Sequence, residues 1–413
     1  MKNKKLWLIG AMTMISLASW AQEDTLSLPE KNAQRLSILD NDFGKWGRLK
    51  ISGYLQGQWQ LAESKGAAAF ADGGSFGSRI DNRFMIRRGR IKFAYSVGIV
   101  QAVFQPDFTE KGVKIKDAYI AVTAPSKIIG GQLGVFDRPF GYEISYSSSL
   151  RESPERSRVF LSLFPDERDL GAMATLKYGE FTLNGGVFNG TGVASENDSH
   201  KDFIGRLAWL KQTANAQVGL AFSYYGGGVT ASSEQYYTYN KAEGFKAESQ
   251  KPGAIHLRQY FGASAQYLQM WGAGTTNLRA EFLWGQQPGT EKNNNMVSGG
   301  TPDKADLYLR NFMGGYAILV QDIGRSKHSL VLKYDYYDPN TKVSGNQIGQ
   351  LAGTSAADIA YSTFGVGYLF RWNNNLRLMA YYDMVSNEKT ENLADFKGRI
   401  HQNVLTIRAQ VKF

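Results

Sequence analysis

Strict alternation of apolar and polar residues is the feature that most constrains how this chain folds. Over residues 51–61, one parity carries isoleucine, leucine, tryptophan and glycine, while the other carries serine, tyrosine and glutamine. Residues 403–413 repeat the pattern and end at an aromatic residue, Phe413. Successive side chains of a strand point to opposite faces, so a period of two predicts strands with one apolar and one polar face.

Fourteen further strands are predicted between these two, which makes sixteen. They cover residues 83–97, 98–107, 113–124, 127–136, 169–178, 181–188, 202–210, 215–225, 255–269, 276–285, 307–321, 328–338, 358–371 and 376–385. Seven short turns alternate with eight longer connections, which cover 62–82, 108–112, 137–168, 189–201, 226–254, 286–306, 339–357 and 386–402. Loop 226–254 opens with three glycines and is predicted to be flexible. An even number of strands places both ends of the chain on the same side of the barrel.

This organisation predicts an all-β fold, a transmembrane antiparallel β-barrel of about 16 strands with short periplasmic turns and long extracellular loops. Only helices and closed barrels satisfy every backbone polar group in lipid, and the chain has no second long apolar run that would form a membrane helix. Aromatic residues near strand ends, such as Tyr224-Tyr225, Tyr381-Tyr382, Trp271 and Trp372, are expected to form interfacial girdles. The alternative is a soluble β-sandwich or jelly roll, which would not need the asymmetry between long and short connections.

The first 21 residues predict export. A lysine-rich start is followed by a mostly apolar stretch, residues 6–18, and by the small-x-small sequence Ser19-Trp20-Ala21, which is the layout of a secretory signal peptide. The alternative is an N-terminal anchor helix. Residues 22–47 are predicted to form a short periplasmic segment and residues 48–413 the barrel. An exported chain does not meet chromosomal nucleic acid, so the formal charge of +10 needs another explanation. The absence of cysteine excludes disulfides and cysteine metal sites.

The polar parity of the strands predicts a basic lining. Sixteen strands leave a water-filled lumen, and thirteen basic residues fall on the parity expected to face it. They are Arg88, Arg90, Lys92, Lys114, Lys116, Lys177, Arg206, Arg258, Arg279, Lys333, Arg377, Arg408 and Lys412. The acidic residues on this parity are Asp107, Glu281, Asp335 and Asp383. A pore lined by one sign of charge concentrates the opposite ion, and arginine matches phosphate oxygens two at a time. The pattern therefore predicts an anion-binding, pore-lining role for the basic set.

Two details disturb this parity. Phe84 and Ile86 share a parity with Arg88, and Asp117 falls on the apolar parity of its strand. A bulge or a position at the rim would account for either.

The longest connection, loop 137–168, is expected to fold into the lumen as a constriction. Arg151, Arg156 and Arg158 would then hold the loop to the wall or present charge to a solute. The alternative for the basic lining is that it stiffens the wall by pairing with the acidic residues of this loop. Those residues are Glu143, Glu152, Glu155, Asp166 and Glu167.

Several segments resemble the phosphate-selective porin O and P family. They are residues 83–93, 113–120, 131–143, 154–156 and 186–190 and the terminal Phe413, in order through most of the mature chain. The resemblance implies a sixteen-stranded barrel, usually trimeric, with a folded-in loop after the fifth strand and a ladder of arginines with a lysine cluster that guides anions. Arg88, Arg90, Lys114 and Lys116 are the positions here that would stand in such a ladder.

No catalytic centre is expected. The four histidines, at positions 200, 256, 328 and 401, are scattered and form no His-x-x-x-His pair. The prediction is an outer-membrane porin of a Gram-negative bacterium, without enzyme activity, cofactor or metal, that passes small anions by passive diffusion, with phosphate or polyphosphate as the leading solutes. Its expected partners are outer-membrane lipid, lipopolysaccharide and further copies of itself in a homotrimer, but not nucleic acid. The alternatives are a general porin without phosphate selectivity and a structural or adhesion barrel.

Overall fold

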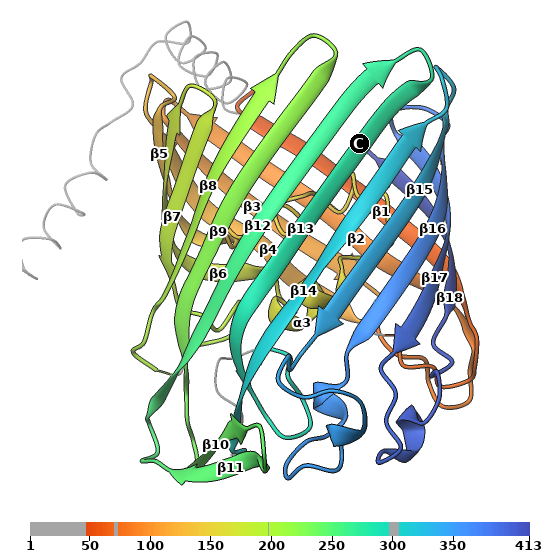
Figure 1. Ribbon diagram of the computed structural model, residues 1–413. Coiled ribbons are helices and arrows are strands. Elements are labelled where there is room, and N and C mark those ends of the chain that lie inside the picture. Colours follow the sequence, from red (N-terminus) through yellow and green to blue (C-terminus); the bar gives the residue numbers. More distant parts are fainter. Residues whose placement is uncertain (1–46, 70–72, 197, 297–304) are drawn as a thin grey trace, which may run out of the picture. The chain divides into compact units, whose positions relative to one another are not determined.

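The computed structural model describes residues 47–69, 73–196, 198–296 and 305–413, and within them sixteen strands close into an antiparallel barrel (Figure 1). The sheet closes where β1 pairs with both β18 and β2. The barrel strands are β1 (Leu49–Ala62), β2 (Asn82–Val97), β3 (Val100–Thr109), β4 (Gly112–Thr123), β5 (Ile129–Asp137), β6 (Arg168–Tyr178), β7 (Phe181–Phe188), β8 (Asp202–Gln212), β9 (Ala216–Thr230), β12 (Ile255–Trp271), β13 (Gly274–Gly289), β14 (Leu307–Asp322), β15 (His328–Asp338), β16 (Tyr361–Arg371), β17 (Leu376–Asn387) and β18 (Val404–Lys412). The predicted barrel of about sixteen strands is confirmed.

The predicted signal peptide, residues 1–21, and residues 22–46 of the predicted periplasmic segment lie outside the described residues. Of the helices in the described part of the chain, none is long and apolar enough to cross a membrane.

Alternation gives the wall its two faces. Leu183, Leu207 and Phe222 are direct cross-strand neighbours on β7, β8 and β9, and about half of each side chain is exposed on the outer face. On the inner parity of the same strands, Arg206 lies opposite Ser223, which is buried. Cross-strand rows of this kind cover the outer wall with apolar side chains, as a surface facing hydrocarbon requires.

The two ends of the barrel differ in their connections, and we call them the turn end and the loop end. At the turn end, Gly98 and Gly179 adopt positive φ angles of 56° and 57°. Glycine takes this left-handed conformation without the steric cost that a Cβ would add, which permits the tight reversals there. The long connections all emerge at the loop end (Figure 1).

The prediction of a flexible loop at 226–254 is wrong, because this segment is largely strand. Its first glycines belong to β9, where a Cβ at Gly227 would lie 2.1 Å from Asp202. Glycine is therefore needed there for the close approach of a buried carboxylate. Two further strands, β10 (Gln235–Asn240) and β11 (Gly244–Ser249), form a hairpin at the loop end. The hairpin is attached to the barrel by parallel pairing of β10 with β14.

The predicted aromatic girdles are correct for only part of the aromatic residues. Trp271 and Trp372, near the turn end, are exposed on the wall, as predicted. In the Tyr224-Tyr225 and Tyr381-Tyr382 pairs, Tyr225 and Tyr381 are fully buried instead. Adjacent residues of a strand point to opposite faces, so only one member of each pair can face lipid.

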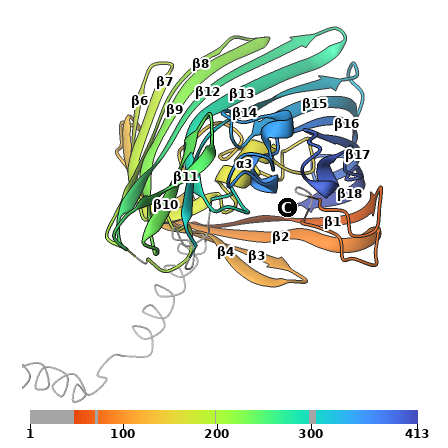
Figure 2. The ribbon, with the colours of Figure 1, turned by 60° about the horizontal axis from the view of Figure 1, so that its bottom comes forward.

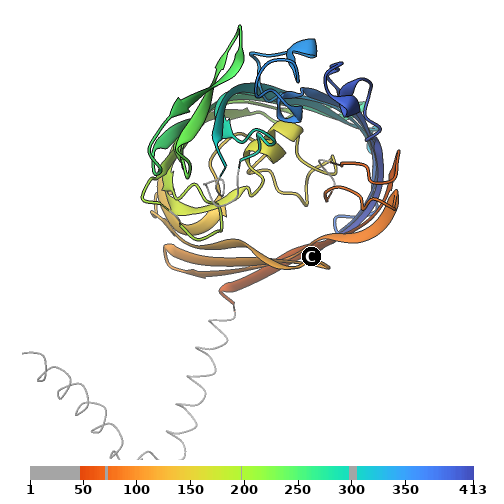
Figure 3. The same ribbon diagram turned by 90° about the horizontal axis from the view of Figure 1, so that it is seen from below.

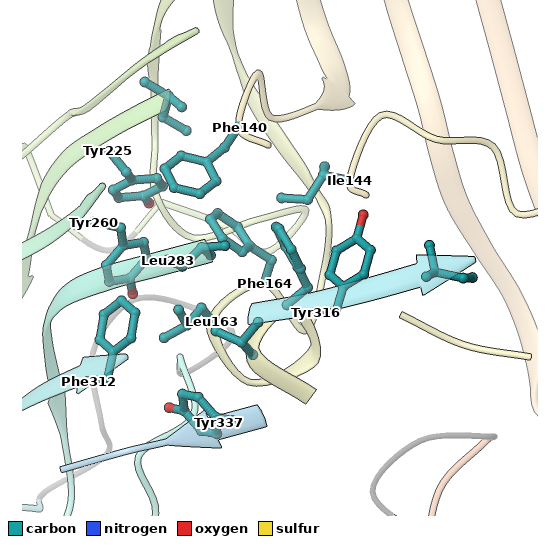
Figure 4. Packing of buried hydrophobic residues seen from close by; sticks show 14 of the residues in the cluster. Phe140, Ile144, Leu163, Phe164, Tyr225, Tyr260, Leu283, Phe312, Tyr316 and Tyr337 are labelled. Carbon is teal, nitrogen blue, oxygen red and sulfur yellow. The ribbon is translucent and has the colours of Figure 1, made fainter. Parts of the chain in front are cut away.

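The buried core lies inside the barrel, between the wall and the connection from β5 to β6. We call this connection, residues 138–167, the inner loop; it includes the short helix α3 (Arg158–Leu163), which packs on β14 and β15 (Figures 2 and 3). The ring of Phe164 meets Tyr260 edge-on at 5.8 Å (Figure 4), and Phe160 meets Tyr316 at 6.3 Å. Burying each large apolar side chain contributes about 1.5–3 kcal/mol, so these contacts hold the loop against the β9–β16 side of the wall.

Candidate functional site

Polar contacts fix the inner loop to the same side of the wall. The carboxylate of Glu281 on β13 accepts hydrogen bonds from the backbone N–H groups of Tyr142 and Glu143, both at 2.6 Å. The Glu143 carboxylate in turn lies 3.0 Å from the Lys333 ammonium on β15. Burial alone would raise the pKa of Glu143, but the charges of Lys333 and Arg151 outweigh burial and lower that pKa. The carboxylate therefore stays ionised and holds the lysine.

Glu155 joins the inner loop to the opposite part of the wall. Its carboxylate lies 2.6 Å from both Arg87 and Arg88 on β2, and 3.3 Å from Arg408 on β18. Burial alone would raise the pKa of Glu155, but these three guanidinium groups hold it well below its usual range. Charge-assisted bonds to several arginines fix the position of the loop more firmly than a single ion pair would.

Two cavities lie between the inner loop and strands β1–β4. The loop-end cavity, of about 320 Å³, is bordered by Gly73, Glu110 and Lys111 from the loop end of the barrel. The turn-end cavity, of about 360 Å³, is bordered by Ser52 and Lys412 near the other end. Arg90 and Arg156 border both cavities, so they mark the boundary between them.

Cationic side chains outnumber anionic ones along both cavities. Among the residues that the structure describes, seven cationic and five anionic ones border the loop-end cavity, and five cationic and two anionic ones border the turn-end cavity. Lys92, Lys114 and Lys412 make no ion pair with any residue that the structure describes. Their charges are therefore left to act on whatever occupies the cavities.

The inward positions of Arg88 and Arg90 on β2 follow from a break in the inward–outward alternation of that strand. Phe84 and Ile86 are exposed on the outer face, but Arg88 and Arg90, on the same sequence parity, are buried inside. The shift occurs between Arg87 and Arg88, because both of these neighbours bind Glu155 inside the barrel. This break explains why Phe84 and Ile86 disturbed the predicted parity.

A bulge in β4 explains the second disturbance. The pairing of β3 with β4 shifts between Gln105 and Pro106, which leaves Lys116 as an extra residue on β4. Pro106 has no N–H for the ladder, and proline within a sheet is typical of a bulge. Both Lys116 and its neighbour Asp117 consequently lie inside, where Asp117 accepts a hydrogen bond from Arg168 at 3.1 Å.

The structure separates the predicted lining residues by what they contact. Those that border the two cavities are Arg88, Arg90, Lys92, Lys114, Lys116, Arg156 and Lys412. Those that hold the wall or the inner loop are Arg258 with Asp202, Arg279 with Glu152, Lys333 with Glu143, Arg408 with Glu155, and Arg377 with the Leu150 carbonyl. Arg206 borders a third cavity, of about 250 Å³, beside Pro139 and Gly141, and Lys177 is exposed near a turn.

The other two predicted arginines of the inner loop lie away from the two cavities. Arg158 places its guanidinium 4.0 Å above the ring of Tyr361. Arg151 is buried, and its Nε and Nη1 have no hydrogen-bond partner among the described residues. Burial, with the charges of Arg156 and Arg88 beside it, lowers the pKa of Arg151 to about 9.

Pairing between basic wall residues and acidic loop residues is therefore present, as the alternative reading of the sequence expected. Glu143, Glu152, Glu155 and Glu167 all pair with wall cations. The sequence pattern missed the inward positions of Arg87 and Asp117 and the role of Arg168. Pro106, near the end of the predicted strand 98–107, was the one signal that could have revealed the bulge.

Features typical of a hydrolase or of a metal site are few in the described chain. Residues 73–77 have the spacing Gly-x-Ser-x-Gly, but they lie in the β1–β2 loop rather than at the strand–turn–helix that a nucleophile elbow requires. No group of three or more metal-ligating side chains occurs among the described residues.

Comparison with known families and structures places this geometry among outer-membrane channels. The model of the family phosphate-selective porin O and P matches residues 72–413. A comparison with curated protein sequences gives no significant match.

Solved structures resemble the chain in fold. OprB of Pseudomonas putida has a TM-score of 0.57 at 11% identity, covering 92% of this chain and 97% of its own. The trimer form of OmpT of Vibrio cholerae has a TM-score of 0.53 at 11% identity, with 88% and 99% covered. The anion-selective porin from Comamonas acidovorans has a TM-score of 0.51 at 10% identity, with 88% and 99% covered. At these identities the likeness establishes the barrel architecture alone.

Proposed function

The chain belongs to the phosphate-selective porin O and P family, and from this premise we propose that it forms an anion-preferring diffusion channel with phosphate as a principal solute. The channel is an outer-membrane porin, with its short turns toward the periplasm and its long loops outside the cell. The passage runs between the inner loop and strands β1–β4, through the two cavities. Export by the predicted signal peptide brings the chain to the membrane, where the apolar outer wall contacts lipid and lipopolysaccharide.

The observation that carries this proposal is the excess of cations along the passage. The excess is largest in the turn-end cavity, where Lys92 and Lys412 have no carboxylate partner in the described part of the chain. A water-filled passage with walls of low dielectric constant focuses such charge and raises the local concentration of anions. Rings and rows of arginine and lysine are the usual lining of anion and phosphate pores.

Two relatives in fold agree with finer parts of the proposal. The porin from Comamonas acidovorans is described as anion-selective, and OmpT of Vibrio cholerae as a trimer. We extend both properties to this chain as part of the proposal: anion preference from the lining charge, and a homotrimer from the family.

A general anion porin without phosphate selectivity is the second candidate, and one observation favours it. Carboxylates neutralise several of the arginines that would hold a phosphate: Glu155 binds Arg88, and Asp107 binds Arg90 at 2.8 Å. A channel with its arginines already paired would prefer anions through the field of its lysines, and would distinguish phosphate from chloride only weakly.

Planar-bilayer recording of the purified protein tests both candidates. Under a potassium chloride gradient, the reversal potential should show preference for chloride over potassium. Phosphate added at millimolar concentration should then reduce the chloride current if a discrete phosphate site exists. Preference for chloride without block by phosphate would indicate the general anion porin, and preference for potassium would refute an anion channel of either kind.

A further inference from the structure

Four cationic side chains converge on one carboxylate of the inner loop, that of Glu167. Arg168 contacts it directly. Three more cations surround it at longer distances: Lys116 Nζ at 3.5 Å, Arg156 Nη1 at 3.6 Å and Arg90 Nη2 at 3.7 Å. These three distances exceed those of charge-assisted hydrogen bonds, which are about 2.7–2.9 Å. Glu167 therefore neutralises the three cations without using their hydrogen-bond donors.

The three more distant cations differ in what else they bind. Arg90 donates to Asp107, and Arg156 donates to the backbone carbonyls of Glu143 and Ile144. Lys116, by contrast, makes no hydrogen bond within the described chain, and Glu167 is its single ion-pair partner there. The ammonium of Lys116 thus keeps all three of its donors available.

This cluster lies on the proposed path of the solute. Arg90, Lys116, Arg156 and Glu167 all border the loop-end cavity, and Arg90 and Arg156 also border the turn-end cavity. Burial alone would raise the pKa of Glu167, but the surrounding cations, Lys116 first, hold it well below its usual range. A fixed negative charge therefore stands where the two cavities meet.

We propose that Glu167 is a tethered competitor of the permeating anion, which occupies the cationic position of Arg90, Lys116 and Arg156 and so sets the affinity of the channel for oxyanions. This inference rests on the proposed function, since it names the residue that tunes the same passage. A carboxylate presents two oxygens to these cations much as a phosphate does. Lys116, Arg90 and Arg156 attract an oxyanion in the loop-end cavity only to the extent that the charge of Glu167 leaves their charges uncompensated. Conduction needs binding weak enough to permit release, and a built-in competitor supplies that limit.

The test is the block of chloride current by inorganic phosphate in planar bilayers, compared between the wild type and Glu167→Gln. The variant removes the charge but keeps the shape of the side chain. Removing a unit charge about 5–7 Å from a solute in partly hydrated surroundings should strengthen block by about three- to tenfold. The preference for chloride over potassium should also rise. Glu152→Gln is the matched control, because Glu152 is an equally buried carboxylate of the inner loop that pairs with Arg279 and borders neither cavity. It should leave the phosphate concentration at half-block unchanged.

Lys116 provides an internal check. Lys116→Gln alone should change phosphate block little, because Glu167 already neutralises that lysine. In the Glu167→Gln background, the same substitution should remove most of the increase in phosphate block that Glu167→Gln produces. Glu167→Asp withdraws the carboxylate by one methylene. Phosphate block in this variant should be stronger than in the wild type and weaker than in Glu167→Gln.

Several outcomes would overturn the inference. Unchanged or weaker phosphate block in a folded Glu167→Gln channel would show that the carboxylate does not compete with the solute. An equal increase of phosphate block in Glu152→Gln would show that loosening the inner loop, rather than removing the charge of Glu167, strengthens the block. Failure of both Glu167 variants to assemble would assign this residue to holding the loop instead. Each of these results leaves the proposed function standing if the wild type prefers anions, whereas a wild type that prefers cations would remove the proposed function itself.

Discussion

The ammonium of Lys333 on β15 lies 3.0 Å from the carboxylate of Glu143 in the inner loop, although 190 residues separate them in the chain. Both side chains are buried, and Glu143 also accepts hydrogen bonds from the backbone N–H and the hydroxyl of Ser157, each at 2.9 Å. One carboxylate thus joins the barrel wall, the first part of the inner loop and the residue that precedes α3. The position of the loop depends on this ion pair together with the aromatic contacts.

Replacing Lys333 with methionine should destabilise the folded barrel and free the inner loop. Removing one partner of a buried ion pair leaves the other charge uncompensated, which costs about 3–5 kcal/mol. Urea unfolding in lipid vesicles would measure the loss of unfolding free energy. Single-channel recording should show a larger conductance with more current noise. The double variant Lys333→Met with Glu143→Gln should recover part of the stability. Lys177→Met, at an exposed lysine, is the control, and an equal loss in that variant would contradict the assignment.

Acid should release the contacts of three inner-loop carboxylates only well below neutral pH. The pKa values of Glu143, Glu155 and Glu167 are all lowered from the ordinary value of 4.5 by neighbouring cations that outweigh the effect of burial. Depressed carboxyl pKa values contribute stability above the ordinary value, and this stability is lost as the pH falls through the folded-state pKa. The contacts of these three carboxylates should therefore persist from pH 7 to pH 5 and be lost only below about pH 4.5, where conductance should change. No change in conductance below pH 4.5 would show that these carboxylates do not control the loop.

Neutralising the unpaired lysines should reduce anion preference without reducing stability. Lys92→Gln together with Lys114→Gln removes two charges that border the passage and bind no carboxylate among the described residues. The chloride-to-potassium permeability ratio should fall by about two- to fivefold, since the field of the lining concentrates anions. The free energy of unfolding should change by no more than about 0.5 kcal/mol, because neither lysine is buried or paired with a carboxylate of the described chain. In Lys177→Gln the ratio should not change; a similar fall there would mean that charge anywhere on the barrel suffices.

The β4 bulge can be tested by substitutions on its two faces. Asp117→Leu should lower the free energy of unfolding by about 1–3 kcal/mol, because it removes a buried carboxylate that Arg168 binds. Ile115 lies two residues earlier, on the lipid face. Ile115→Leu should lower the free energy of unfolding by less than about 1.5 kcal/mol. Thermal unfolding in detergent would compare them. If leucine at position 117 were neutral or stabilising, Asp117 would lie on the lipid side, as unbroken alternation would have placed it.

The wall could be predicted from the sequence because each strand carries its own signal. Period-two alternation and the lengths of the connections are local properties, and they located all sixteen barrel strands. Alternation predicted the wrong inward-facing side chains where a strand departs from a regular ladder, as at Arg87-Arg88 and at Lys116. A single extra residue there changes which side chains face inward, and only the pairing partner reveals it.

The site was less predictable because it depends on contacts between distant segments. The basic residues could be assigned to the inner face, but not divided between passage and loop attachment. That division depends on where the inner loop lies, and the loop is placed by partners such as Glu281, Tyr260 and Tyr316, far away in the sequence. The hairpin of β10 and β11 was missed for a related reason, since it is attached by pairing with β14, about seventy residues further along the chain.

The aromatic cluster has a consequence for how wide the channel is. Along β14, Phe312 and Tyr316 face inward into a packed interior, while the outer face of the wall meets hydrocarbon. Where this cluster packs, strands β12–β16 are buried on both sides, like the central strands of a water-soluble protein. The three cavities lie instead along β1–β8 and the facing edge of the inner loop. The number of strands fixes the girth of this barrel, but the bore is set by the volume of one loop, so residues 138–167 can change the permeability of the channel without altering a single hydrogen bond of the wall.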